Sequence, residues 1–153
     1  MLPSLRKRRF GLLWRKRPDS CPAVPLVAGG KSFGGRMTSQ AQAASALLDV
    51  CGLAFLGFPL HLAGRLSDER AQHLFKIEVP MLFLQGTRDK LADVALLQRL
   101  TERLGARASL QLLQDADHSF HVPPRAGRKD ADVRREMMDM LAAWTFSVTS
   151  RRG

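Results

Sequence analysis

The sequence predicts an α/β fold in which helices cover both faces of a mostly parallel β-sheet. The segments expected to form strands are continuous apolar runs, which is typical of strands buried on both faces. A segment with helical character separates each of these runs from the next, as in parallel α/β proteins. The chain has 153 residues, of which 45% are hydrophobic, and this is enough for one domain with its own core.

The first two predicted strands lie at residues 26–28 and 50–58. Pro25 opens the first strand, and Gly29-Gly30 end it, because glycine and proline mark strand boundaries. Residues 34–48 between the strands are rich in Ala, Gln and Ser, and we expect a helix there. Its predicted apolar face consists of Met37, Ala41, Ala44 and Leu48.

The second half of the chain predicts two further strands, at residues 80–85 and 108–113. Gly86 ends the first of them. Apolar residues at helical spacing predict three more helices. We interpret the apolar face of each helix as an ordinary core face. These helices are expected at residues 67–76, 93–104 and 131–146.

Most of the formal net charge of +10 is concentrated at the start of the chain. Residues 1–18 contain seven of the 24 basic residues and none of the 14 acidic ones. Such an arm could bind nucleic acid or an anionic membrane surface, but runs of charge seldom fold and are usually solvated. We therefore expect a basic arm and linker at 1–23, a folded domain at 24–148 and a basic tail at 149–153, with no specific nucleic-acid partner and no membrane partner.

The chain shows no apolar stretch of the 18 or so residues that a membrane-spanning helix needs. The apolar run after Arg8-Arg9-Phe10 is also too short for a secretory signal. Cys21 and Cys51 are the only cysteines, so no disulfide framework is indicated. We expect a soluble protein of the reducing cytoplasm.

The most specific motif is Gly30-Lys31-Ser32-Phe33-Gly34, a G-x-S-x-G sequence between a predicted strand and a predicted helix. This is the context of a nucleophile elbow, in which a serine lies on a sharp turn. The residues two positions before and after it must be small, because the strand and the helix approach closely there. Ser32 is the candidate nucleophile. The backbone N–H of Phe33 and the helix N-terminus could stabilise an oxyanion.

The same residues also resemble the end of a phosphate-binding loop, G-x-x-x-x-G-K-S. That motif requires glycine where this chain has Pro25. The nucleophile elbow is the better interpretation.

Two further residues follow in the order Ser, Asp, His. Asp89 lies just past the strand at 80–85, and His118 lies beyond the strand at 108–113. The carboxyl ends of parallel strands meet at one edge of the sheet, so these side chains could converge on Ser32. His118 would accept the serine proton, and Asp89 would orient the imidazole and stabilise its cation.

Alternatives remain for these two roles. Asp89 could cap the following helix, a position for which Asp93 also competes. His121 could serve as the base, although the loop position favours His118.

Other polar residues have structural interpretations. We expect His61 and His73 to be structural or surface residues and Asp115 and Asp117 to form turns. The spacing of the four histidines and two cysteines predicts no metal site, and no cofactor is expected.

Four runs of the chain together resemble one branch of a known family. They are LVAGGKSFGGRMTS, LGFPLH, VPMLFLQGTRD and DADHSF. They resemble the KANL3/Tex30-like branch of α/β-hydrolases, relatives of the dienelactone hydrolase group, over about residues 24–148. The resemblance implies Ser32 as nucleophile, Asp89 as acid and His118 as base.

The resemblance also implies several strands before the elbow and a second oxyanion donor from one of their loops. Only the basic arm precedes the first recognisable strand, so we expect a chain that is truncated relative to that family or that starts in a divergent or mis-assigned region. An open sheet edge would then favour self-association.

The predicted function is that of a serine hydrolase, an esterase-like enzyme that cleaves an ester or related acyl bond of a small molecule through an acyl-enzyme. The alternative is a catalytically impaired α/β-hydrolase-like interaction module.

Overall fold

The computed structural model describes residues 24–152, so the predicted arm at 1–23 lies outside the described residues. Four parallel strands form one sheet in the order β1-β2-β3-β4. The predicted α/β fold is confirmed. The strands are β1 (Leu26–Lys31), β2 (Val50–Leu56), β3 (Met81–Gly86) and β4 (Ala108–Leu113).

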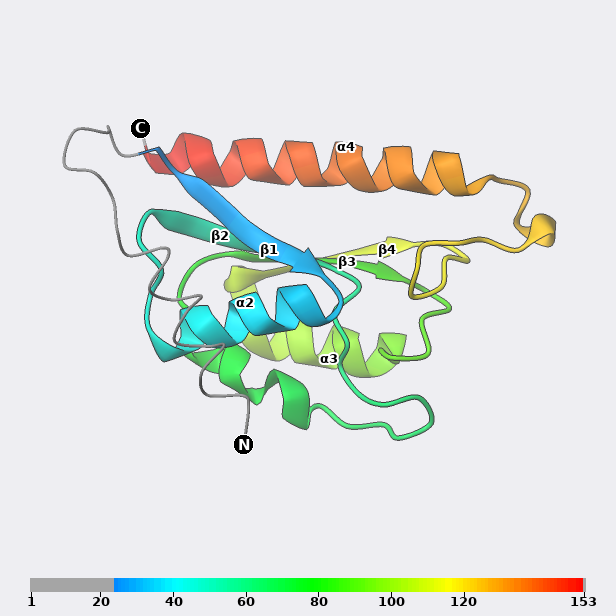
Figure 1. The fold of residues 1–153 in the computed structure, drawn as a ribbon, viewed down its shortest axis with the longest axis horizontal. Coiled ribbons are helices and arrows are strands. Elements are labelled where there is room, and N and C mark those ends of the chain that lie inside the picture. Colours follow the sequence, from blue (N-terminus) through cyan, green and yellow to red (C-terminus); the bar gives the residue numbers. More distant parts are fainter. Residues whose placement is uncertain (1–23, 153) are drawn as a thin grey trace.

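Helices cover both faces of this sheet (Figure 1). Helices α2 (Phe33–Ala44) and α3 (Val94–Leu104) lie below the sheet in the view of Figure 1, and α4 (Asp130–Thr149) lies above it. The segment predicted as a helix at 67–76 is a 3₁₀-helix, η1 (Glu69–Lys76). Three short 3₁₀ turns complete the described elements: η2 (Gly105–Arg107), η3 (Pro124–Ala126) and η4 (Ser150–Arg152).

The two faces of the sheet carry two hydrophobic clusters. On the face of α2, η1 and α3, the rings of Phe55, Phe58 and Phe83 pack with centroids 4.9–5.8 Å apart, a distance typical of favourable aromatic pairs. On the other face, Leu82 and Leu84 are among the side chains that pack beneath α4. Strand β3 is therefore buried on both sides, as its continuous apolar run predicts.

The predicted apolar face of the first helix is wrong at Ala44 and Leu48, whereas Ala41 packs against the hydrophobic core. Ala44 and Leu48 are exposed, and Leu48 lies beyond the end of α2. The face of α2 turned to the sheet instead consists of small and polar residues: Gly35, Thr38, Ser39 and Gln42. The physical reason is the close approach of α2 to β1 and β2, which leaves no room for a large side chain at Gly35.

Helix α4 continues past residue 146, where the sequence pattern placed its end, to Thr149. Its Trp144 packs against Gly52 of β2, where a Cβ atom would lie 2.7 Å from the indole ring. No helix among residues 24–152 is long and apolar enough to cross a lipid bilayer.

Strand β1 pairs with β2 and forms one edge of the described sheet. Gly29 lies opposite Ala54 in this pairing, and a Cβ atom at residue 29 would lie 1.9 Å from the Ala54 carbonyl oxygen. The two backbones can therefore adopt this register only because residue 29 has no side chain.

We expect Gly29→Ala to lower the free energy of unfolding by about 3 kcal/mol, because neither backbone can move without breaking the ladder. Gly34→Ala is the matched control. Nothing among residues 24–152 lies within 4 Å of its new Cβ, and alanine in a helix is favoured over glycine by roughly 0.5–1 kcal/mol. Urea unfolding of the two variants measures the difference; equal stabilities would contradict the prediction.

Candidate active site

Ser32 occupies a sharp turn between β1 and α2. Its backbone has φ 50° and ψ −124°, a conformation that costs a non-glycine residue on the order of 1–3 kcal/mol. The turn is held by a hydrogen bond from the Ser32 N–H to the carbonyl of Leu56, at 3.0 Å. Neighbouring structure thus imposes the strained geometry expected of a nucleophile elbow.

The small residues around Ser32 are not equally necessary. A Cβ at Gly30 would lie 3.0 Å from backbone atoms of Gly34 and Gly35, and one at Gly35 would lie 2.6 Å from the Gly30 carbonyl oxygen. At Gly34, by contrast, a Cβ would meet nothing within 4 Å in the described part of the chain. The close approach of strand and helix therefore depends on Gly30 and Gly35.

Asp89 follows the carboxyl end of β3. Gly86 allows the loop after β4 to approach closely, because a Cβ there would lie 2.3 Å from the Ala116 carbonyl oxygen. The N–H of Arg88 donates to that same carbonyl. The Asp89 side chain is fully buried, and its Oδ1 accepts a hydrogen bond from the Leu91 N–H at 2.8 Å.

His118 lies on the loop after β4, which its own polar residues shape. Asp115 has a positive φ of 60°, and Oδ1 of Asp117 accepts hydrogen bonds from the N–H groups of Ser119 and His121. Asp115 and Asp117 are therefore turn residues, as the sequence predicts. The loop presents the His118 ring to Ser32 with a quarter of its side chain exposed.

These loops bring Ser32, His118 and Asp89 into one chain of hydrogen bonds. The Nε2 atom of His118 lies 2.8 Å from Ser32 Oγ, and its Nδ1 atom lies 2.7 Å from Asp89 Oδ2. Because an ionised carboxylate only accepts hydrogen bonds, the proton of the neutral imidazole lies on Nδ1. Nε2 is then free to accept the Ser32 hydroxyl proton, the arrangement that a general base needs.

The competing assignments have other structural explanations. Asp93 caps α3, since its Oδ1 accepts a hydrogen bond from the Leu96 N–H at 2.8 Å. His121 points to Asp130 at the start of α4, with 2.6 Å between Nδ1 and Oδ2. The hydrogen bond from His121, together with that from the Val122 N–H, lowers the pKa of Asp130 below its usual value.

The two remaining histidines tie elements together. His61 accepts a hydrogen bond from the Asp93 N–H on Nε2, and its Nδ1 lies 2.8 Å from the Leu62 carbonyl oxygen. His73 of η1 lies 2.7 Å from the Ser39 hydroxyl of α2. Among residues 24–152, no group of three or more His, Cys, Asp or Glu side chains is arranged to hold a metal ion.

Phe33 is the first residue of α2. The first N–H groups of an α-helix have no acceptor within the helix, and the helix dipole makes this end electropositive. The Phe33 N–H directly follows Ser32, which is the position of one oxyanion donor in a nucleophile elbow.

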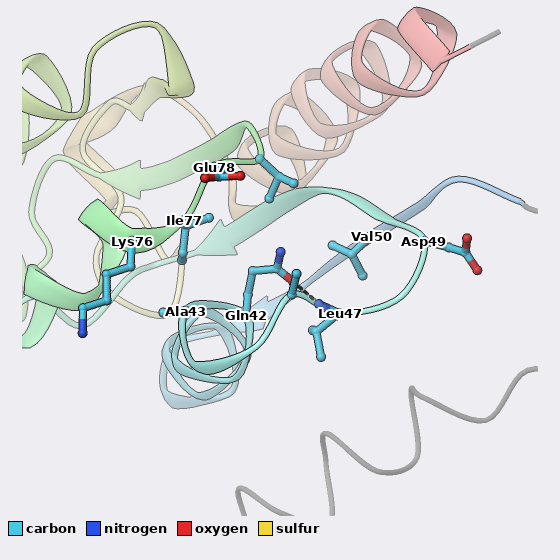
Figure 2. Close-up of a pocket in the computed structure, with 10 residues that line it drawn as sticks. Gln42, Ala43, Leu47, Asp49, Val50, Lys76, Ile77 and Glu78 are labelled. Carbon is cyan, nitrogen blue, oxygen red and sulfur yellow. Dashed lines mark hydrogen bonds between the residues drawn. The ribbon is translucent and has the colours of Figure 1, made fainter.

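A cavity of about 370 Å³ opens at the other end of the sheet (Figure 2). It lies among the end of α2, the loop before β2 and the segment before β3; Gln42, Leu47, Asp49, Lys76 and Glu78 contribute to its wall. Ser32, Asp89 and His118 follow the carboxyl ends of the strands, whereas this cavity adjoins the amino ends. It is therefore separate from the hydrogen-bonded chain at Ser32.

Sequence reasoning missed one residue of the site, Gln85. This side chain is completely buried at the end of β3, and its Nε2 donates to Asp89 Oδ2 at 2.5 Å. A polar residue at the end of an otherwise apolar strand, four positions before a proposed catalytic acid, was the available signal. Buried amides are retained where they have hydrogen-bond partners.

A family model described as "Alpha/beta hydrolase domain" matches residues 9–146. The chain belongs to the α/β-hydrolase family.

Solved structures agree with this fold. The chain is similar to a serine hydrolase without a lid from Xanthomonas campestris, with 25% identity and a TM-score of 0.53, over 78% of this chain and 48% of that one. It is also similar to the esterase domain of a Rhodothermus marinus protein, with 18% identity and a TM-score of 0.56, over 89% and 63% of the two chains. A third is a serine hydrolase homologue from Coxiella burnetii, with 17% identity and a TM-score of 0.51, over 63% and 42%. The α/β-hydrolase chain described here thus spans from 42% to 63% of the length of these structures.

The backbone strain at Ser32 predicts a difference between two substitutions that both remove the hydroxyl group. Ser32→Gly and Ser32→Ala lose the same hydrogen bond to His118, but only glycine adopts a positive φ without strain. We expect Ser32→Gly to be more stable than Ser32→Ala by about 1 kcal/mol in chemical unfolding, after its greater unfolded-state entropy is included. An Ala variant as stable as the Gly variant would mean that the turn is unstrained.

Proposed function

We propose that this α/β-hydrolase chain carries the catalytic triad of a serine hydrolase that cleaves an ester or related acyl bond of a small molecule. The observation that carries the proposal is the continuous chain of hydrogen bonds from Ser32 Oγ through His118 to Asp89. A serine hydroxyl is a weak nucleophile, and a base within hydrogen-bond reach is what activates it.

In the proposed reaction, His118 Nε2 takes the Ser32 hydroxyl proton as Oγ attacks the carbonyl carbon of the substrate. The negative charge that develops on the carbonyl oxygen is stabilised by the Phe33 N–H and the N-terminus of α2. Asp89 stabilises the imidazolium of His118. His118 then returns the proton to the leaving alkoxide, and an acyl-enzyme remains on Ser32.

Water completes the cycle. His118 accepts a proton from the water molecule that attacks the acyl carbonyl, and it returns that proton to Ser32 Oγ as the acid product leaves. No step requires a metal ion or an organic cofactor.

Within the family, we assign the chain to the KANL3/Tex30-like branch. The four ordered sequence runs support this assignment, and three of them contain Ser32, Asp89 and His118. We also propose a cytoplasmic location, which the free thiol of Cys51, buried in β2, supports because unpaired cysteines are common in reducing compartments.

A fluorophosphonate probe tests the proposal, because it reacts covalently with an activated serine. We expect labelling of the wild-type protein at Ser32, no labelling of Ser32→Ala, and a rate about 10⁴-fold lower for Asp89→Asn, in which the wrong imidazole tautomer is favoured. His118→Ala should lose labelling as well, whereas His121→Ala should retain most of it. Mass spectrometry of the labelled peptide identifies the modified residue.

A cooperative thermal melt of each variant is the control for folding. A protein that melts cooperatively but remains unlabelled would reject the hydrolase and favour an interaction module with the same fold. Labelling of Ser32→Ala would place the reactive residue elsewhere.

A further inference from the structure

Gln85 connects the proposed catalytic acid to the end of a neighbouring strand. Its Oε1 accepts a hydrogen bond from the Phe58 N–H at 3.0 Å, and its Nε2 donates to Asp89 Oδ2 at 2.5 Å. A backbone N–H only donates, so the amide oxygen must face Phe58 and the amide nitrogen must face Asp89. The orientation of the amide is therefore fixed by its two partners.

The amide nitrogen shares one carboxylate oxygen with the imidazole. Asp89 Oδ2 accepts from both Gln85 Nε2 and His118 Nδ1, while Oδ1 accepts from the Leu91 N–H. With these three donors the carboxylate cannot rotate without losing a hydrogen bond. In a site where the side chain of Asp89 is fully buried, no water replaces a lost partner at low cost.

The amide oxygen of Gln85 binds the turn that packs against the His118 ring. Phe58 directly follows Gly57, which has a positive φ of 71° and lies against the His118 ring. A Cβ at Gly57 would lie 3.6 Å from both Nδ1 and Cε1 of that ring. Gln85 thus fixes the turn after β2 relative to the carboxylate after β3, and His118 sits between them.

We propose that Gln85 is a positioning residue of the triad, which holds the Asp89 carboxylate in the orientation that keeps Oδ2 within hydrogen-bond distance of His118 Nδ1. This inference rests on the proposed function and adds a residue that the Ser-His-Asp pattern does not include. The hydrogen bond that the structure describes between Gln85 and the three proposed catalytic side chains goes to Asp89. We expect this bond to carry most of the effect of Gln85 on Ser32.

The first test is the hydrogen bond from His118 Nδ1 to Asp89, read from the chemical shift of the Nδ1 proton in NMR spectra above neutral pH. We expect a strongly downfield Nδ1 proton in the wild-type protein and a proton further upfield in Gln85→Met, which has a similar volume but no donor, because the carboxylate is then no longer held in line with Nδ1. This measurement requires no catalysis, so it decides the role of Gln85 even if Ser32 proves unreactive. An unchanged chemical shift of the Nδ1 proton in Gln85→Met would overturn the inference.

The second test is a double-mutant cycle on the rate of fluorophosphonate labelling. We expect Gln85→Met to lower the rate roughly 10–100-fold, which is the effect seen when the hydrogen-bond partner that orients a metal-binding side chain is removed. In the Asp89→Asn background, the same substitution should change the rate little, because the group through which Gln85 acts is already gone. Rate losses that multiply in the double variant would show a general structural role and reject the inference.

Gln42→Met is the matched control. Gln42 is also buried, and its Oε1 also accepts a backbone hydrogen bond, from the Leu47 N–H at 2.9 Å, but it lies at the opposite end of the sheet. We expect it to lower the melting temperature without changing the shift of the His118 Nδ1 proton or the labelling rate. Gln85→Asn, whose shorter amide cannot span both partners, is the second variant in case Gln85→Met does not fold, and it should show the upfield shift and the slower labelling.

Discussion

The site depends on how closely the backbones approach one another at the carboxyl ends of the strands. Gly30 and Gly35 allow α2 to begin directly against β1, and this contact forces Ser32 into its left-handed turn. Gly86 similarly allows the loop after β4 to lie against the end of β3. Without these approaches the three proposed catalytic side chains would still follow three strands, but their polar atoms would not meet at hydrogen-bond distance.

The burial of Asp89 makes its hydrogen bonds hard to replace. A carboxylate in water exchanges hydrogen bonds freely, whereas that of Asp89 is enclosed and must be satisfied by the donors around it. Two of those donors come from separate segments. Gln85 lies on β3, just before the loop that carries Asp89, and His118 lies on the loop after β4. The carboxylate therefore couples the packing of the sheet to the orientation of the imidazole that faces Ser32.

The histidines show how a common fold separates structural from reactive groups. His61 and His73 connect loops and helices, and His121 pairs with Asp130 at the start of α4. Only His118, among the four, lies between a serine hydroxyl and a buried carboxylate within residues 24–152. All four have the same intrinsic chemistry, so the surrounding hydrogen bonds determine what each can do.

The sequence by itself determined the parallel α/β architecture, because buried strands and their intervening helices have distinct apolar patterns. It also determined that Ser32, Asp89 and His118 follow the ends of three strands, since chain order and strand direction are local properties. The tertiary structure decided that His118 rather than His121 faces Ser32, that α2 turns small and polar residues to the sheet, and that Gln85 belongs to the site. The first two features rest on contacts between segments far apart in the chain, and such contacts leave no periodic signal in the sequence. Gln85 is only four residues from Asp89, but the burial of both side chains comes from the packing around them.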